Sequence, residues 1–548
     1  MRTASGATAV QIAESVEGKR RIVRHVGSAR DEAELGVLMD RARDLLVDDL
    51  QGLLDLGMQV PQRVTKLVPA PAPRALLRPV EPAGLDASRR PVVTSGVTSR
   101  AQVLRSSSGI LYEVLAGVFD ELGFGVVGDA CFRDLVIARI VEPTSLLDAD
   151  RVLADLGRAA ASHSTRKRTL RRAQAGDYRD QIAAACFERA ATAGDISLVL
   201  YDVTTLYFEA EKEDDLRRVG FSKERRVDPQ IVVGLLVDRT GFPLEIGCFE
   251  GNKAETLTLL PVIRRFQERH DLDGVVVVAD AGMLSAANLR ELEEAGLRFV
   301  VGARQTRAPL DLESHYRWHG EVLTDGQVID TITPKHRGAR TENDASRRAE
   351  PTWDARTHPA SWRAVWAYSG KRFARDNRAL NAQEARARAV VAGERTARTP
   401  RFVKTRGDSR SLDEAALARA RRVAGLKGYL TNIPATTMSA GEVITSYHDL
   451  WHVEQSFRMS KTDLQARPIF ARTRDAIEAH LTIVFTALAV SRVIQDRTGT
   501  SIRRTLRELR PLRSATIEIN GVIRTFPPAV SDDQQALLDA IKNPAPRH

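Results

Sequence analysis

Two short runs of apolar residues, each followed by an aspartate, are the clearest elements that the hydrophobic pattern predicts. One run, in ISLVLYDVTT, ends at Asp202, and the other, in GVVVVADAGM, ends at Asp280. Continuous apolar runs of this length are typical of strands buried on both faces of a sheet. Between them, QIVVGLLVD and FPLEIGCFE flank an Arg-Thr-Gly turn and predict a hairpin, and a helix should follow at about residues 255–269. A further helix, at about residues 285–295, and a strand, RFVVGA, complete an α/β pattern.

Apolar residues at helical spacing dominate residues 107–193 and predict a mostly helical N-terminal domain. The strongest apolar helix is expected at residues 475–496. It is bounded by Arg474 and Arg497, so we expect it to cover the sheet rather than to cross a membrane.

A third carboxylate, Glu454, lies in the segment YHDLWHVEQSFRMSK, which predicts an amphipathic helix. Tyr447 and Lys461 each lie seven residues from Glu454, two helical turns away, so all three should share one face of that helix. Two strand-end aspartates and a glutamate offer oxygen ligands, which suit Mg²⁺ or Mn²⁺. Each acid alone has an ordinary explanation, as a turn cap or a surface residue, so the predicted metal site rests on the three together.

The same segment resembles the signature Y-x2-R-x3-E-x6-K of one branch of the bacterial insertion-sequence DDE transposases, in the IS-four-type superfamily. Tyr447, Glu454 and Lys461 match the signature, whereas Leu450 occupies the position of its arginine. Arg458, one turn past Glu454, is a candidate to supply the missing positive charge.

The resemblance extends through GFSKERRVDPQIVVGLLVDRTGFPL and GYLTNI and covers about residues 100–495. It implies a ribonuclease-H-like mixed sheet flanked by helices, with a β-rich insertion, and it places Asp202 and Asp280 on adjacent central strands. It also implies a DNA transposase that hydrolyses phosphodiester bonds at insertion-sequence ends and transfers the freed strand to target DNA. With two Mg²⁺ or Mn²⁺ ions, Asp202 would bridge both, while Asp280 and Glu454 would each bind one.

Basic residues form the candidate DNA contacts. Lys461 is either a solvated lysine or is placed to reach a phosphate near the one that is cut, which we favour. Tyr447 either packs against the sheet or contacts the DNA backbone, and Arg458 is a further candidate for such a contact. A separate cluster lies in SHSTRKRTLRRAQ and consists of Arg166, Lys167, Arg168, Arg171 and Arg172. Such a run is either a solvated helix face or a set of phosphate contacts, and phosphate contacts of this kind give affinity without reading sequence.

Composition agrees with a polyanionic partner. Among 548 residues, 81 are Lys or Arg and 71 are Asp or Glu, giving a net charge of +10. The preference for arginine over lysine also fits a GC-rich genome, which accounts for part of this surplus. Three widely spaced cysteines indicate neither a disulfide framework nor a zinc knuckle. With no signal-peptide pattern and no apolar run of about 18 residues, we expect a cytoplasmic protein that associates with the nucleoid through DNA.

Changes in pattern divide the chain into segments. Residues 304–427 are arginine-rich, carry four scattered tryptophans and separate Asp280 from Glu454 by 174 positions, which indicates an insertion between two parts of the core. Base stacking by one of these tryptophans is an alternative to a core role. The expected segments are an N-terminal hairpin and helix (1–68), a proline-rich linker (69–106), a helical DNA-binding domain (107–193), core (194–303), insertion (304–427), core (428–496) and a C-terminal tail (497–548).

Two alternatives to a transposase stay open at this point. One is a ribonuclease-H-like nuclease that cuts without strand transfer, which has no evident need of the long insertion. The other is a DNA-binding derivative that cannot cut, suggested by Leu450. His448 and His452 have the spacing of a zinc-binding pair, but no third ligand is evident in the sequence. A transposase must bring two DNA ends together, so the resemblance also implies a homodimer.

Overall fold

The computed structural model describes the backbone of residues 8–16 and 19–29 and, apart from short gaps, residues 101–542. The gaps are at residues 195, 210–211, 221–227, 273, 283–284, 337–341, 345, 396–400, 407–408, 468 and 470. The chain divides into two compact units, one of residues 1–90, 324–326 and 368–425 and one of residues 91–323, 327–367 and 426–548. The helix expected after the N-terminal hairpin, for which the sequence pattern indicates about residues 33–56, lies outside the described residues, as does the linker up to residue 100.

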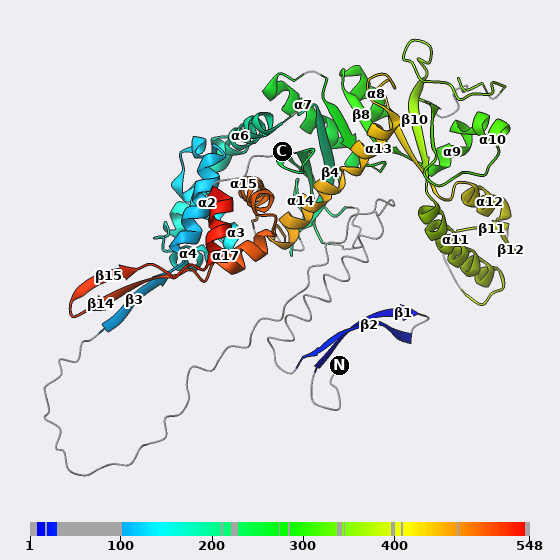
Figure 1. The fold of residues 1–548 in the computed structure, drawn as a ribbon. Helices are drawn as coiled ribbons and strands as arrows, with labels where there is room; N and C mark the ends of the chain where they lie inside the picture. The colour runs from blue at the N-terminus through cyan, green and yellow to red at the C-terminus, as the bar shows by residue number, and fades with distance from the viewer. Residues whose placement is uncertain are drawn as a thin grey trace. The chain divides into compact units, whose positions relative to one another are not determined.

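An eight-stranded mixed sheet is the centre of the second unit, with the order β6-β5-β4-β7-β8-β13-β10-β9 (Figure 1). The strands β4, β5 and β6 are antiparallel neighbours, whereas β7 and β8 run parallel to β4 on its other side. This is the strand order of a ribonuclease-H-like core, so the predicted fold class is confirmed. The core strands are β4 (Leu198–Tyr207), β5 (Gln230–Asp238), β6 (Pro243–Glu250), β7 (Val276–Ala279), β8 (Arg298–Ala303) and β13 (Leu426–Thr431).

Helical crossovers connect the parallel strands, because neighbouring parallel strands cannot be joined by a tight turn. The short helix η2 (Glu255–Leu257) and α7 (Leu259–His270) lead from β6 to β7, and α8 (Ala286–Glu294) leads from β7 to β8. The buried residues of α7 include Leu259, Ile263 and Phe266, which have the spacing of one apolar helix face. The hairpin, both helices and the strand after them lie where the apolar pattern predicts them.

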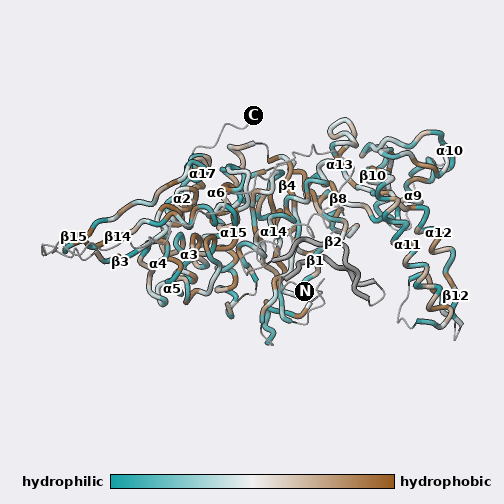
Figure 2. Tube along the Cα trace, turned by 60° about the horizontal axis from the view of Figure 1, so that its bottom comes forward, coloured by the Kyte–Doolittle hydropathy of each residue, from teal (hydrophilic) through white to brown (hydrophobic). Residues whose placement is uncertain are grey.

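The helices before β4 gather around α15 (Arg474–Thr498), which contacts α2, α3, α5 and α6 as well as β6. In Figure 2 hydrophobic stretches follow the strands of the sheet and α15. Within the described residues α15 is the one helix long and apolar enough to cross a membrane, but 94% of its most apolar window is buried inside the protein. It is therefore a core helix, as predicted. The N-terminal helices are α2 (Gly109–Glu121), η1 (Phe124–Val127), α3 (Ala130–Val141), α4 (Ala149–Asp155), α5 (His163–Ala175) and α6 (Tyr178–Ala193).

The insertion does not form a β domain of its own, because two of its strands extend the central sheet. β9 (Val328–Pro334) and β10 (Ser361–Tyr368) pair antiparallel and continue the sheet beyond β13. Before them lie η3 (Gln305–Arg307), α9 (Ala308–Asp311) and α10 (Glu313–His319). The rest of the insertion belongs to the first unit, where α11 (Gly370–Val391), the hairpin β11 (Val403–Arg406) and β12 (Ser409–Leu412), and α12 (Glu414–Arg422) surround a small apolar cluster.

Three of the four tryptophans in the insertion are core residues. Trp362 and Trp366 on β10 are fully buried and Trp353 is 4% exposed, whereas Trp318 on α10 is 40% exposed. Gly428 of β13 lies directly beneath the Trp366 ring, and a Cβ there would meet ring carbons at 2.6 Å. Of these four tryptophans, Trp318 alone is exposed enough to stack on a DNA base.

Both ends of the second unit meet in a three-stranded sheet that the sequence pattern does not predict. β3 (Ala101–Ser107), within the expected linker, pairs with β14 (Ser514–Ile519), which also pairs with β15 (Val522–Phe526). Arg513 reinforces this closure, since it donates to the carboxylate of Asp155 at 2.6 Å and to the Ser106 carbonyl at 2.7 Å. The tail also contains α16 (Ile502–Leu509) and α17 (Asp532–Lys542). At the N-terminus, β1 (Thr8–Val16) and β2 (Lys19–Ala29) form the hairpin expected there.

We predict that Arg363→Ala strongly destabilises the second unit. The Arg363 side chain is fully buried on β10, donates to both carboxylate oxygens of Asp330, and donates to the carbonyls of Ile433 at 3.1 Å and Met438 at 2.7 Å. Removing it leaves those acceptors without their donor, at a cost of about 3 kcal/mol. Urea unfolding should show this loss, while Arg347→Ala, which removes a 77% exposed side chain, should change stability by less than about 0.5 kcal/mol.

Candidate active site

Asp202 and Asp280 lie side by side on adjacent parallel strands. Tyr201 of β4 pairs with Ala279 of β7, and Asp202 and Asp280 are the residues that follow each of them. Residues at the same level of neighbouring strands project from the same face of a sheet, so the two carboxylates share a face. Asp202 is half-buried and Asp280 is exposed. The core thus assembles the first two predicted ligands.

The expectation that Asp202 ends its strand is wrong. β4 continues to Tyr207, because its residues from Val203 onward keep pairing with β5 after β7 has ended at Ala279. Asp202 therefore lies in the middle of β4, at the level where its parallel neighbour stops. This is the carboxyl end of β7, an edge where α/β sheets commonly bind ligands.

Two hydrogen bonds orient the Asp280 carboxylate. The Tyr447 hydroxyl donates to Asp280 Oδ1 at 2.5 Å, and the backbone N–H of Ala281 donates to the same oxygen at 2.7 Å. Oδ2 accepts no hydrogen bond from the residues that the structure describes. Burial, followed by the charge of Asp280, raises the pKa of Tyr447, so the phenol stays protonated and remains a donor. One carboxylate oxygen is fixed and the other faces outward.

Gly302 makes room for this contact. A Cβ at Gly302 of β8 would lie 2.7 Å from the Tyr447 hydroxyl oxygen and 3.0 Å from the Ala281 Cβ, which is too close for either. Tyr447 itself is 8% exposed, and the Lys427 ammonium lies 4.7 Å from the centre of its ring. Of the two alternatives for Tyr447, the burial favours packing inside the protein, where its hydroxyl faces a candidate metal ligand.

The predicted single helix carrying Tyr447, Glu454 and Lys461 is two helices. α13 (Ala440–His448) ends with Tyr447 in its last turn, and α14 (Trp451–Thr462) carries Glu454 and Lys461. Between them, the backbone N–H of Leu450 bonds the Tyr447 carbonyl at 3.2 Å, a tighter three-residue pattern at the junction of the two helices. The seven residues from Tyr447 to Glu454 therefore span this junction, whereas the seven from Glu454 to Lys461 lie within α14.

Leu450 and its neighbour Asp449 hold the junction between α13 and α14 against the rest of the protein. Leu450, which stands where the signature has arginine, is 8% exposed, so it packs inside the protein. Arg239, in the turn between β5 and β6, donates to Asp449 Oδ2 at 2.9 Å. An arginine thus approaches this junction from another part of the chain, which the sequence reasoning missed.

α14 is fixed to the edge of the sheet by its buried face. It packs against β4 and β5, with Val453 and Phe457 among its buried residues. The Ser456 hydroxyl donates to the Gly241 carbonyl at 2.8 Å, and the buried Arg492 of α15 donates to Gln455 at 3.0 Å. On its other faces Glu454 and Arg458 are exposed and Lys461 is half-buried. The third acid therefore lies on a helix that is held beside the strand carrying Asp202.

Three carboxylates repel one another, so such a site closes only around a cation. In the described part of the chain, Asp202, Asp280 and Glu454 do not form a group with all ligand atoms within 4.8 Å, whereas one other group elsewhere does. Their oxygen donors nevertheless suit a hard divalent ion, because β4, β7 and α14 present them from rigid elements.

The basic cluster on α5 divides into buried and exposed residues. Arg166 is fully buried and pairs with Asp150, so its prediction as a DNA contact is wrong. Arg172 donates to Asp129 Oδ2 at 2.6 Å and packs α5 against the start of α3. The spacing of basic residues along the sequence does not show which side chains are buried or ion-paired within the fold. The other four members are exposed, and of these Lys167, Arg168 and Arg171 have no ion pair with an acid among the described residues.

A cleft of about 1070 Å³ lies beside these exposed residues and is strongly basic. It is lined by α3, α5, the segment after α14 and α15, and one acid, Asp475, is among its lining residues. Burial lowers the pKa of Arg139 to about 10 and that of His480 to about 3, so at neutral pH the arginine is charged and the histidine is not. The basic lining residues are Arg139, His163, Lys167, Arg171, Arg467, Arg472 and His480.

The model of a protein family described as the transposase DDE domain matches residues 193–490, more than half of the chain. The chain belongs to the DDE transposase family. It is therefore an enzyme that acts on DNA, in a family that uses divalent metal ions. No curated protein matches the chain. One similar solved structure is the piggyBac transposase synaptic complex with hairpin DNA. The match covers 72% of this chain and 70% of the piggyBac chain, with 10% sequence identity and a TM-score of 0.34. At this distance no residue role or partner is carried over.

The residues of this transposase that sequence reasoning missed are those defined by long-range contacts. Arg239 and Gly302 reach the site from β-strand ends far from the signature segment, and Arg492 lies in a helix read only as apolar. The one available signal was Gly302 itself, because a glycine within the strand RFVVGA often marks a close approach of another group.

We predict that Gly302→Ala lowers DNA cleavage by the transposase about 10- to 100-fold, since orienting contacts to metal ligands have effects of this size. The new Cβ displaces the Tyr447 hydroxyl and so releases Asp280. Tyr447→Phe should cause a loss of similar size. In that background the hydroxyl is gone, so Gly302→Ala should add little, and a double-mutant cycle of cleavage rates measures the coupling. Fully additive losses would show that Gly302 acts elsewhere.

Proposed function

We propose that Asp202, Asp280 and Glu454 bind the divalent metal ions with which this transposase cuts DNA at the ends of an insertion sequence and joins them to a target. The observation that supports this most directly is the parallel register of β4 and β7, which puts Asp202 and Asp280 on one face at the same level. Bound there, two Mg²⁺ or Mn²⁺ ions would activate the attacking oxygen and stabilise the leaving oxygen. Asp202, Asp280 and Glu454 together would hold these ions.

The protein's own groups position this chemistry. Tyr447 and the Ala281 N–H hold one oxygen of Asp280, so its other oxygen keeps a fixed direction. Glu454 joins from α14, whose buried face is anchored on β4 and β5. Lys461 and Arg458 would contact phosphates next to the bond that is cut, because they follow Glu454 on the same helix.

The basic cleft is the proposed path of the DNA backbone away from the cut. Lys167 and Arg171 on α5 line it together with Arg467 and Arg472 from the segment after α14. The Arg467 guanidinium also lies 5.2 Å from the ring centre of Tyr207, at the end of the strand that carries Asp202. A continuous set of cations from the catalytic strand to α5 would follow successive phosphates of duplex DNA.

The finer assignment is a transposase for terminal inverted repeats that works as a homodimer in the cytoplasm, where both DNA ends are held together. A nuclease that cuts without strand transfer would need the same three acids. Only an assay of the joining step distinguishes such a nuclease from a transposase. A derivative that binds DNA without cutting was suggested by Leu450. The burial of Leu450 and the nearby Arg239 weaken that alternative, because the junction is packed and charged without an arginine at this position.

We predict that Asp202→Asn, Asp280→Asn and Glu454→Gln each lower cleavage more than about 100-fold, beyond the loss for groups that only orient a ligand. Each change removes a negative ligand but keeps the side-chain size, so duplex binding should persist. The measurement is cleavage of a labelled duplex carrying the element's end, and joining of a pre-cut end, with Mg²⁺ or Mn²⁺. Glu294→Gln on α8, an exposed position, is the matched control. Full cleavage by any of the three variants would refute the site.

We predict that Lys167→Gln with Arg171→Gln weakens duplex binding at every sequence and lowers the salt slope of the association constant by about two. The control is Arg168→Gln, because Arg168 is exposed on the same helix but does not line the cleft. Fluorescence anisotropy across a salt series gives both values. Equal effects of Arg168→Gln and of each single cleft variant would show that α5 attracts DNA through general charge, without a path in the cleft.

A further inference from the structure

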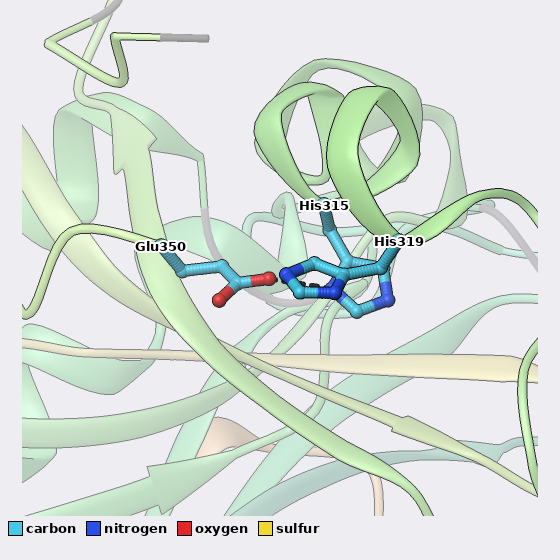
Figure 3. A group of neighbouring side chains, drawn as sticks. All are labelled: His315, His319 and Glu350. Atoms are coloured by element: carbon cyan, nitrogen blue, oxygen red, sulfur yellow. Dashed lines mark hydrogen bonds and ion pairs between the residues drawn. The ribbon is translucent and has the colours of Figure 1, made fainter. Parts of the chain in front are cut away.

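A second cluster of metal-ligating side chains lies in the insertion, within the second unit. His315 and His319 project from α10, and Glu350 lies in the segment before β10 (Figure 3). One ligand atom from each of the three lies within 4.8 Å of the others, and within the described residues no other group of three does so. The three acids of the proposed catalytic site take no part in it.

The geometry around His315 already resembles that of a metal ligand. Its Nδ1 lies 2.5 Å from Glu350 Oε1, and its Nε2 lies 3.3 Å from the Gln327 side-chain amide. A histidine that binds a metal through one ring nitrogen usually donates its other N–H to a nearby oxygen. The Gln327 amide supplies that oxygen when it is turned over, an orientation that a hydrogen-bond network decides.

His319 completes the set from the next turn of the helix. The two imidazole rings are stacked, with centres 5.0 Å apart, and the Glu350 carboxylate points toward them. His315 is 6% exposed, Glu350 is half-buried and His319 is exposed, so the cluster opens to solvent on one side. A fourth ligand position is therefore accessible to water.

Two contacts made by residues before Glu350 hold its segment against α9 and α10. The Asn343 amide donates to the Asp311 carbonyl at 3.1 Å, and the Arg348 guanidinium lies 5.4 Å from the centre of the Trp318 ring. These contacts do not involve the three ligands. The ligands are thus brought together by the surrounding structure, which lowers the cost of organising a site.

We propose that His315, His319 and Glu350 bind Zn²⁺ or a similar borderline transition-metal ion. Two imidazoles and one carboxylate form a zinc-type donor set, whereas Mg²⁺ prefers oxygen ligands. Tetrahedral zinc draws its donors to about 3.3 Å apart at bond lengths of 2.0–2.1 Å, a shift that the exposed His319 can make. With the metal bound, neutral His315 would carry its one ring proton on Nε2, facing the Gln327 amide, and its Nδ1 would bond the metal. The ion would tie α10 to the segment that leads into β10.

The test is zinc binding by the full chain, without a histidine tag, measured by metal analysis after dialysis and by the visible spectrum with Co²⁺. We expect one zinc per chain, a tetrahedral Co²⁺ spectrum, and a loss of affinity of more than about 100-fold in His319→Ala and Glu350→Gln. Both residues are at least partly exposed, so these variants should fold. His336→Ala, an exposed histidine of the same insertion, is the matched control and should keep the zinc.

Asp202→Asn separates this site from the catalytic one, because it should keep the zinc while losing cleavage. Zinc should also raise the melting temperature of the wild type but not that of His319→Ala. Binding that is unchanged in His319→Ala, or no zinc in the wild type, would overturn the proposal. His315 and Glu350 would then form a hydrogen bond only.

Discussion

The parallel pairing of β4 with β7 is the constraint on which the proposed catalytic site depends. It makes Asp202 and Asp280 neighbours, although 78 positions separate them in the chain. Parallel neighbours need a crossover, and β6 with α7 provides one whose buried apolar face lies on the sheet. The hairpin between the two aspartates is thus required by the topology, since it fills the antiparallel side of β4 while the crossover leads back to its parallel side. Glu454 then needs only a helix held beside β4.

Packing around Asp280 shows why this sheet had to be extended rather than closed at β8. Tyr447 reaches Asp280 across β8, at the glycine position 302, and Lys427 of β13 lies over its ring. The strand β13 pairs antiparallel with β8 and so brings the residues before the signature helices next to the catalytic edge. The insertion occupies the chain between these two strands and adds β10 and β9 beyond β13. The insertion therefore extends the same sheet that carries Asp202.

Local patterns in the sequence predicted most of the core because each strand and helix there has its own apolar period. The hairpin, α15 and the two strands next to the aspartates lie where the pattern places them, although β4 continues past Asp202. Features that depend on distant residues were not predictable. β3 pairs with β14 across more than 400 positions, the buried Arg166 pairs with Asp150, and the helix ends after Tyr447 at a junction where Leu450 packs inward. In each case the deciding partner is remote in sequence, so no window contains the information.

Two histidine pairs in this chain show that sequence spacing alone does not identify a metal site either. His448 and His452 have the same four-residue spacing as His315 and His319, so periodicity cannot rank one pair above the other. The fold separates them. His448 contacts the Tyr429 hydroxyl at 3.3 Å and His452 lies against Trp451, whereas a carboxylate meets the other pair from 31 positions beyond His319. A third ligand is supplied by tertiary structure and not by spacing. The proposed site with two histidines and the proposed site with three carboxylates would then select different metals, since imidazole favours zinc and carboxylate alone favours magnesium. One chain would thus keep a structural ion apart from its catalytic ions.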